Sequence, residues 1–526
     1  MKRSQSNQFG QILKRAVLCA ALFIAGGVVQ AQTITLKSEG GGLSLSGRFI
    51  NFDGEIIQID SDYGILAMRL GQLICEGEAC PTADNFLPTL RLSGASRMSD
   101  VLMPALVEGF ARAQGFQTES IDLDTGQLRQ TLLQDGVPVA AFHFRATNTD
   151  NGFADLFARE ADIVMAVREV RPTEVTSGQD AGLGRLDEAR QSRIIALDAL
   201  VPVIAPQNDL PVISLSQLAS IFSGDVTNWS AIGGEKRAIK PFLGSPEDGM
   251  TQRFVDGVLG ISDTPMSANV DQGLAADEIA LAIASTPGAV SILPYRDIGN
   301  GRAIALGDKC GFISAPNVLT LKTEDYPLTA PLFLYFPKWR LPEFGREFLA
   351  WLRSPEAQLI VRRAGFVDQG PVPIPLDAQG QRFANAIAAA GSDMPLSELQ
   401  RMVRVLGQYV RLSTSFRFEV GSNRLDAQSR SNLFNLAQAI SDGRYQDRRL
   451  LLVGFSDGRG GAAANRSLSA DRSETVLRNL EQVIGGALPD GVLVETEAFG
   501  EALPLGCDDT EWGRQMNRRV ELWVSQ

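Results

Sequence analysis

The sequence predicts an α/β protein of several domains, with a small antiparallel β unit near its N-terminus and an α/β sandwich at its C-terminus. Three observations support this prediction. The chain has 526 residues, which is too many for one compact core. Its composition, 44% hydrophobic and 21% charged, is that of a globular protein. The spacing of its apolar residues changes near residue 86 and again near Arg411, so the chain divides into segments of different fold.

The first 31 residues have the features of a secretory signal peptide. Basic residues come first, an apolar run follows from Ala16 to Val29, and Val29-Gln30-Ala31 places small residues where signal peptidase cleaves. The apolar run has about 14 residues, whereas a membrane-spanning helix needs about 20. We therefore expect the chain to be exported and cleaved after Ala31.

Charge and residue types exclude several functions. Lys and Arg total 49 against 61 Asp and Glu, which gives a net charge of −12. An exported protein this acidic is a poor candidate for binding nucleic acid or an anionic membrane surface. The single histidine, His143, leaves too few ligands for a zinc site. We expect no metal and no cofactor.

Residues 32–85 predict the small β unit, because apolar and polar residues alternate between glycines, as in Leu43-Ser44-Leu45. Cysteines in an exported chain favour disulfides. Cys75 and Cys80 enclose a short loop, and we expect them to be bonded. Cys310 and Cys507 remain, in different predicted domains, so whether they pair stays open.

Residues 86–375 alternate strands and helices, for example a helix over Val101 to Gln114 and a buried strand over Ala161 to Ala166. This alternation predicts mainly parallel sheets. Residues 376–411 repeat apolar side chains at helical spacing, as at Leu399, Met402 and Leu406, and predict a packed helical connector.

The segment from Ala196 to Ile204, followed by IFSG, TNW and GG sequences between Leu215 and Gly234, resembles the phosphate-binding proteins of ABC importers. The resemblance extends over residues 86–375. It implies a two-lobed periplasmic-binding-protein fold of type II, with a ligand in the cleft between the lobes and an ABC permease as partner.

In that family, hydroxyls, backbone amides at helix N-termini and an arginine hold phosphate. The resemblance places the cleft at Ser96, Arg97, Thr149, Arg168, Ser245, Asp248 and Thr251. This chain has Ala95 in place of a serine, Gly244 where an arginine would help and Asp248 in place of a hydroxyl. We therefore expect a small anionic or zwitterionic ligand but no tight binding of phosphate. The alternative is a structural envelope scaffold, in which this domain docks another envelope protein.

Residues 412–526 return to a pattern of strands and helices that predicts one sheet with helices on one face. The predicted elements are strands at Thr414–Glu419, Leu450–Phe455, Val492–Ala498 and Arg518–Val524, and helices at Leu425–Ile440 and Leu468–Val483. Four spaced motifs here resemble the OmpA-like peptidoglycan-binding domain: Gly421–Leu425, Gly454–Gly458, Asn465 with Leu468–Arg472, and Asn517–Val520. The resemblance implies a periplasmic protein attached to peptidoglycan and associated with the outer membrane.

The chemistry of this segment is consistent with that resemblance. Asp457 ends a predicted strand, and Arg472 lies in the first turns of the next helix, so both can face one small ligand. A carboxylate binds an ammonium and a guanidinium grips a carboxylate, and diaminopimelate in wall stem peptides carries both groups at one carbon. Asn465, Ser456 and Arg518 would support this ligand. The alternative, a surface salt bridge, contributes only about 0–1 kcal/mol.

Gly454-Phe455-Ser456-Asp457-Gly458 also fits the G-x-S-x-G nucleophile motif of α/β-hydrolases. That mechanism needs a histidine later in the chain, and His143 lies upstream in another predicted domain. Asp508 and Asp509 form an acidic pair that we interpret as a solvated turn. We expect a binding protein with no catalytic residues.

Overall fold

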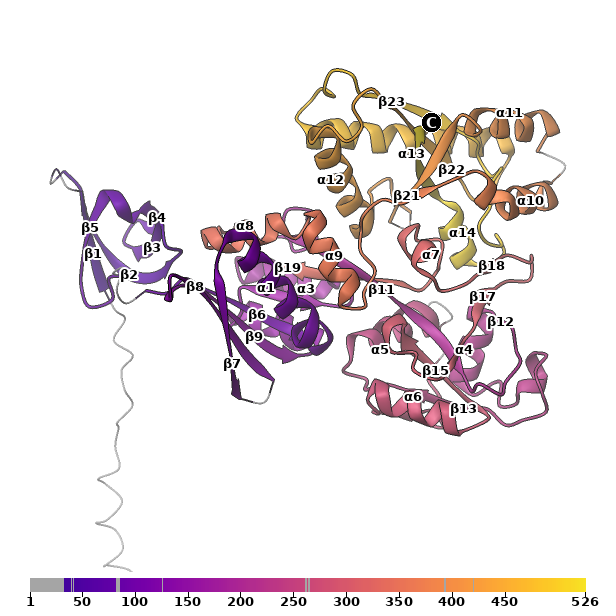
Figure 1. The fold of residues 1–526 in the computed structure, drawn as a ribbon, viewed down its shortest axis with the longest axis horizontal. Helices are drawn as coiled ribbons and strands as arrows, with labels where there is room; N and C mark the ends of the chain where they lie inside the picture. Colours follow the sequence, from indigo (N-terminus) through magenta and orange to yellow (C-terminus); the bar gives the residue numbers. More distant parts are fainter. Residues whose placement is uncertain are drawn as a thin grey trace, which may run out of the picture. The chain divides into compact units, whose positions relative to one another are not determined.

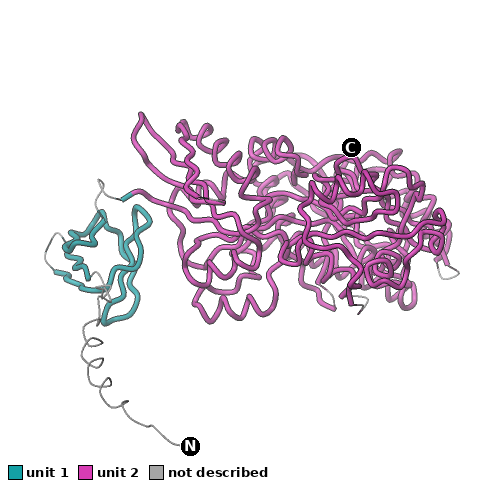
Figure 2. The backbone as a smooth tube through the Cα atoms, turned by 90° about the horizontal axis from the view of Figure 1, so that it is seen from below, with its two compact units in different colours: residues 1–86 teal, residues 87–526 magenta. Residues whose placement is uncertain are grey.

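The computed structural model describes residues 33–38, 40, 42–81, 86–124, 126–260, 263, 265–391, 394–419 and 421–526. The predicted signal peptide, residues 1–31, lies outside the described residues. The chain forms two compact units, residues 1–86 and 87–526 (Figure 2). No helix in the described ranges combines the length and the apolar character needed to cross a membrane.

The first unit is the predicted antiparallel β unit. Its sheet has the order β4-β3-β2-β1-β5, and each neighbouring pair is antiparallel. The strands are β1 (Thr33–Ser38), β2 (Ser44–Phe52), β3 (Ile56–Ser61), β4 (Gly64–Arg69) and β5 (Leu73–Glu76). Alternate side chains from β1 and β3, among them Ile34 and Ile57, form its core. The Cys75–Cys80 disulfide closes the loop that follows β5.

The second unit begins with a domain of two lobes, which we call the two-lobed domain (Figure 1). Lobe 1 contains β6 (Thr89–Ala95), α1 (Met103–Gln114), β7 (Gln117–Asp124), β8 (Gln127–Gln134), β9 (Val137–Thr147), α2 (Thr149–Phe157), β10 (Ile163–Ala166), α3 (Pro172–Asp180), β19 (Thr329–Tyr335), α8 (Glu343–Trp351) and α9 (Pro355–Arg363). Lobe 2 contains β12 (Val212–Ile213), α4 (Leu215–Ser223), β13 (Lys240–Leu243), α5 (Gly249–Phe254), β14 (Asp271–Gln272), α6 (Ala276–Ser285), β15 (Ala289–Pro294), β16 (Arg302–Ala303), β17 (Ala305–Gly307) and β18 (Ile313–Ser314).

One long strand, β11 (Ser192–Ile204), joins the two lobes. Its first half pairs with β19 in lobe 1, and its second half pairs with β15 in lobe 2. Both pairings are antiparallel, and so is the pairing of β10 with β19. The prediction of mainly parallel sheets was therefore wrong for the centre of this domain. Strands that carry the chain from one lobe to the other run against their neighbours, whereas β6 with β9 and β10 are parallel as expected.

The C-terminal domain runs from β20 to β24 and contains one mixed sheet of order β20-β21-β24-β22-β23. Its elements are β20 (Pro373–Ile374), α10 (Gly380–Ala389), α11 (Leu396–Leu406), β21 (Tyr409–Arg417), α12 (Ala427–Ser441), β22 (Arg449–Phe455), α13 (Ala462–Ile484), β23 (Leu493–Ala498), α14 (Glu511–Asn517) and β24 (Arg519–Ser525). Helix α13 begins several residues before the predicted Leu468.

Helices cover both faces of this sheet, whereas the prediction placed them on one face. Leu450 and Leu452 of β22 belong to the core beneath α12 and α13. Leu451 and Val453 point to the opposite face, where α10 and α11 of the predicted connector cover them. A run of consecutive apolar residues is typical of a strand buried on both faces, so the connector helices supply the second layer.

The two-lobed and C-terminal domains share a buried ionic interface. Arg411 of β21 donates to Asp325, in the segment before β19, at 2.9 Å, and lies 3.3 Å from Glu521 of β24. Arg411 and Glu521 are almost fully buried. A second disulfide, Cys310–Cys507, joins the turn between β17 and β18 to the segment before α14. The open question of whether these cysteines pair is thus answered by a bond between the domains.

Candidate functional site

The first candidate site lies where β22 ends against α13. A Cβ atom on Gly454 would lie 2.0 Å from the carbonyl oxygen of Ser469, so only glycine allows this close packing of strand and helix. The Ser456 amide then donates to Gly500 at 2.8 Å, and the Ser469 hydroxyl accepts from the Gly500 amide at 3.0 Å. Local packing therefore holds the strand end, where Asp457 lies, beside the helix that carries Arg472.

Asp457 and Arg518 form an ion pair in this site. Arg518 Nη1 donates to Asp457 Oδ2 at 2.9 Å, and the two side chains are only 19% and 13% exposed. Arg518 Nη2 also donates to Glu511 at 2.6 Å. The predicted supporting arginine is therefore a direct partner of Asp457.

Arg472 is buried beside this pair but has no carboxylate of its own. The residue is 7% exposed, and no acidic group among the described residues lies within ion-pair distance. Its Nη1 is 3.5 Å from the Phe455 carbonyl oxygen, its Nε has no hydrogen-bond partner, and its guanidinium lies 5.8 Å from the Phe418 ring. Burial lowers the pKa of Arg472, the nearby Arg518 lowers it further, and Asp457 opposes both effects. A buried donor without an acceptor is a place for a ligand acceptor.

The other two predicted residues, Ser456 and Asn465, differ in whether their side chains have hydrogen-bond partners. Ser456 is 2% exposed, and its hydroxyl has no partner in the described structure. Asn465 is buried and donates to Glu501. The structure therefore brings all five predicted residues to one end of the sheet, with the Arg472 Nε and the Ser456 hydroxyl unused.

Three acidic residues that were not predicted as site residues complete this site. Glu501 accepts from Asn465, and Glu511 accepts from Arg518. Asp508, interpreted above as part of a solvated turn, is half-buried and accepts from the Gly458 amide at 2.8 Å. Asp509 is exposed. Asp508 follows Cys507 directly, and the sequence had left open whether that cysteine is bonded, so it did not establish that this turn is ordered.

The second candidate site is a cavity of about 530 Å³ between the lobes. Five of the seven predicted cleft residues line it: Ser96, Arg97, Ser245, Asp248 and Thr251. The two others, Thr149 and Arg168, do not. The Thr149 hydroxyl is fully buried and accepts from the Val167 amide at 3.3 Å. Asp248 accepts from the Thr251 amide at 2.9 Å and so caps α5.

One of the two arginines that line this cavity is already paired. Arg97 forms ion pairs with Asp297 and, at 3.5 Å, with the buried Asp198. Asp198, Asp297 and Asp248 all raise the pKa of Arg97, although burial opposes this effect. The lining contains two arginines, Arg97 and Arg296, against three acids: Asp100, Asp248 and Asp297. The cavity therefore has an excess of negative charge.

Arg168 belongs to a network of ion pairs and hydrogen bonds that joins the lobes. It pairs with Asp150 and with Glu174, the latter at 2.6 Å, and its Nε donates to Gln252 of lobe 2 at 3.1 Å. Gln252 donates in turn to Asp150 at 2.7 Å. Arg168 is 3% exposed, so the arginine expected to hold a ligand instead fastens α5 to lobe 1.

Comparisons with known proteins agree with this architecture. The family model of the PBP superfamily domain matches residues 81–356, and that of the OmpA family matches residues 417–518. The phosphate-binding protein PstS of Bacillus subtilis is 26% identical over 189 residues, which cover 36% of this chain and 61% of that protein. The probable lipoprotein YiaD of Escherichia coli is 26% identical over 116 residues, which cover 22% of this chain and 50% of that protein.

The chain thus spans less than two thirds of the length of each of these relatives. Among solved structures, an ABC-type phosphate transport receptor from Vibrio cholerae aligns with a TM-score of 0.41 and 17% identity, over 53% of this chain and 99% of the receptor. The chain belongs to the PBP superfamily and carries an OmpA family domain in its C-terminal part.

Proposed function

We propose that this protein is a periplasmic binding protein held non-covalently on peptidoglycan by its C-terminal domain. The observation that carries the proposal is Arg472, a buried guanidinium with no carboxylate partner in the described structure, beside the ion pair of Asp457 and Arg518. A ligand carboxylate would give Arg472 the acceptor that it lacks. The ammonium group of the same ligand would lie against Asp457.

Diaminopimelate of wall stem peptides has both charges at one carbon, which matches this arrangement. The unused hydroxyl of Ser456 offers one further hydrogen bond. Asp457 would exchange part of its contact with Arg518 for the ligand ammonium, so it stays compensated before and after binding. The match of the OmpA family model to residues 417–518 supports peptidoglycan as the partner of this domain.

Sedimentation with diaminopimelate-type sacculi tests the proposal. We expect the full-length protein to sediment, and Asp457→Ala or Arg472→Ala to remain in solution while keeping the native circular dichroism spectrum. The matched control is Arg478→Ala, which removes an exposed arginine from the same helix. Sedimentation of both site variants like the unsubstituted protein would overturn the assignment.

For the two-lobed domain we propose a ligand of mixed charge, an amine-bearing zwitterion, in the cavity between the lobes. The three lining carboxylates would bind a cationic group, and Ser96, Ser245 and Thr251 provide hydroxyls for its polar remainder. A plain anion would meet more carboxylates than free guanidinium groups. Native mass spectrometry of protein purified from its own periplasm tests this, because a co-purifying amine would be retained and identified.

A second candidate function is favoured by the network of Arg168, Asp150 and Gln252. This network already occupies groups that would otherwise recognise a ligand, as expected of a scaffold that docks another envelope protein. A chain that carries no small molecule but retains one envelope protein through purification would favour the scaffold. In either case we propose export by the N-terminal signal, for which N-terminal sequencing should find Gln32 first.

A further inference from the structure

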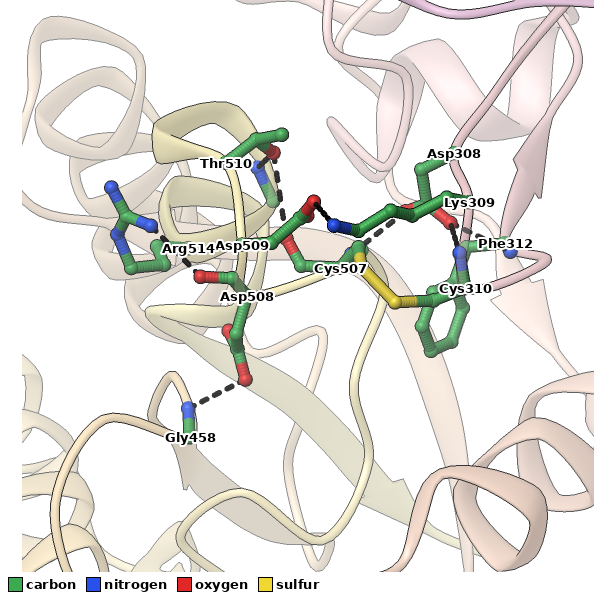
Figure 3. The surroundings of a disulfide bond; sticks show 12 residues. Asp308, Lys309, Cys310, Phe312, Gly458, Cys507, Asp508, Asp509, Thr510 and Arg514 are labelled. Carbon is green, nitrogen blue, oxygen red and sulfur yellow. Dashed lines mark hydrogen bonds and ion pairs between the residues drawn. A yellow bond between two sulfur atoms is a disulfide. The ribbon is translucent and has the colours of Figure 1, made fainter.

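We infer that the segment Cys507–Asn517 is a brace by which lobe 2 positions the peptidoglycan site. This inference rests on the proposed function of the C-terminal domain. The segment is tied to lobe 2 by the Cys310–Cys507 disulfide and, through Asp508, to the amide of Gly458, the residue after Asp457 (Figure 3). Residues of the two-lobed domain would therefore help to determine how tightly the chain holds the wall.

The tie to lobe 2 is covalent and is reinforced by polar contacts. Cys507 is bonded to Cys310, in the turn between β17 and β18. The Asp308 carboxylate accepts from the Cys507 amide at 2.7 Å and, within its own turn, from the Cys310 amide at 3.0 Å. Lys309 pairs with Asp509 at 2.6 Å. The indole of Trp512, in α14, donates to the carbonyl oxygen of Gly257 in lobe 2 at 3.1 Å.

The segment itself is closely packed. A Cβ atom on Gly513 would lie 1.9 Å from the Cys507 carbonyl oxygen, so α14 packs directly on the disulfide-bonded residue. The Asn517 side chain is buried and accepts from the amides of Leu505 and Gly506 at 2.7 and 3.1 Å. A displacement of Cys507 would therefore be passed on to the rest of the segment.

The tie to the site consists of two acidic side chains. Asp508 accepts from the Gly458 amide at 2.8 Å and from Asn517 at 2.8 Å, which holds the turn directly after Asp457. Glu511 accepts from Arg518 at 2.6 Å, and Arg518 donates to Asp457 at 2.9 Å. Both contacts set the position of the Asp457 carboxylate, so Asp508 and Glu511 are positioning residues that need not touch the ligand.

The double variant Cys310→Ser/Cys507→Ser tests the brace in the full-length protein. We expect the amides of residues 457–459 to exchange with solvent about tenfold faster, and binding to diaminopimelate-type sacculi to weaken about tenfold, as for the loss of one hydrogen bond to a charged group. Exchange in β22 and β24 should stay unchanged, because their core lies away from the disulfide. The control Cys75→Ser/Cys80→Ser removes the other disulfide and should alter neither measurement.

The variants Asp508→Ala and Asp508→Asn provide a second, independent test of the brace. Alanine removes the acceptor for the Gly458 amide, so exchange at residues 457–459 should rise, whereas asparagine keeps an acceptor oxygen and should restore slow exchange. Unchanged exchange in both the cysteine variant and Asp508→Ala would overturn the brace. If the unsubstituted protein fails to bind sacculi, the function proposed for the site is wrong, while the exchange measurement still decides whether the brace exists.

Discussion

Replacement of Arg472 by methionine should make the protein more stable and weaken its binding to peptidoglycan. Methionine has about the length of the arginine stem but no polar atoms. In the free protein the guanidinium is buried with an unpaired Nε and a 3.5 Å contact from Nη1 to the Phe455 carbonyl oxygen. An unsatisfied buried donor costs about 1–3 kcal/mol. We therefore expect Arg472→Met to raise the local free energy of unfolding by about 1–3 kcal/mol.

The same change should remove one half of the ligand's charge recognition. Truncating one partner of a buried, hydrogen-bonded charge pair costs about 2–5 kcal/mol, which corresponds to a loss of affinity of about 30-fold to several thousandfold. A gain in stability together with a loss of binding is the signature of a group retained for function.

Hydrogen exchange of the β22 amides is the appropriate stability assay, because a chain of several domains does not unfold in one step. Sedimentation with sacculi measures binding, and Arg478→Met on the exposed side of α13 is the matched control, expected to change neither quantity. Destabilisation of β22 by Arg472→Met, with binding intact, would show that the protein itself satisfies the guanidinium and would refute the reasoning.

Three further predictions concern the cleft and the domain interface. Calorimetry should detect no submicromolar binding of phosphate, because three lining carboxylates outweigh two arginines and Arg97 is already paired; a submicromolar dissociation constant would contradict this. Glu521→Gln leaves Arg382, Arg411 and Arg519 without their shared carboxylate and should cost about 3–5 kcal/mol in local stability at pH 7, measured by hydrogen exchange of the β24 amides. Burial opposes ionisation of Glu521, but the three arginines lower its pKa, so this contribution is lost as pH falls below about 4.5, the ordinary value. Burial raises the pKa of Glu324 from 4.5 to about 8, so the unsubstituted protein should lose stability as pH rises between these two values. Glu324→Gln should reduce the dependence of stability on pH and be the more stable form at pH 8. An unchanged pH dependence in this variant would contradict the prediction.

The proposed peptidoglycan site could be predicted from the sequence to the extent that it is local. Asp457 and Arg472 lie on a strand end and on the helix that directly follows, and the packing of Gly454 on Ser469 brings them together. Glu511 and Asp508 could not be predicted in the same way. They approach from a segment about fifty residues downstream, and its path depends on a disulfide whose partner is in another domain.

For Arg97 in the cleft, the missed feature was its pairing rather than its position. The sequence placed Arg97 in the cleft, and it lines the cavity, but the sequence gave no sign that Asp198 and Asp297 would neutralise it, because those partners are about one hundred or more residues away. Arg168 is a different case. Glu174 follows it by six residues and lies in the first turn of α3, so this local pairing was within reach of sequence reasoning.

The connector also shows what periodicity can and cannot establish. Its helical spacing predicted that Leu399, Met402 and Leu406 are packed, and they are buried. Their destination followed from a different segment, the consecutive apolar residues of β22, of which Leu451 and Val453 form the second buried face of the sheet. The periodicity of an amphipathic helix predicts that one face is buried, but only the apolar surface of its partner shows where that face packs.

Each lobe is attached to the C-terminal domain in a different way. Lobe 2 is attached to that domain by a covalent bond, Cys310–Cys507, which thermal motion does not break. On the side of lobe 1 the side-chain contacts are non-covalent and of unequal strength. The Asp187–Arg424 pair at 3.1 Å is exposed and contributes about 0–1 kcal/mol, whereas Asp325, in the segment before β19, forms a buried ion pair with Arg411 at 2.9 Å. Because the two attachments differ in kind, the variant Cys310→Ser/Cys507→Ser removes the covalent attachment of lobe 2 and leaves the ion pairs on the side of lobe 1 in place.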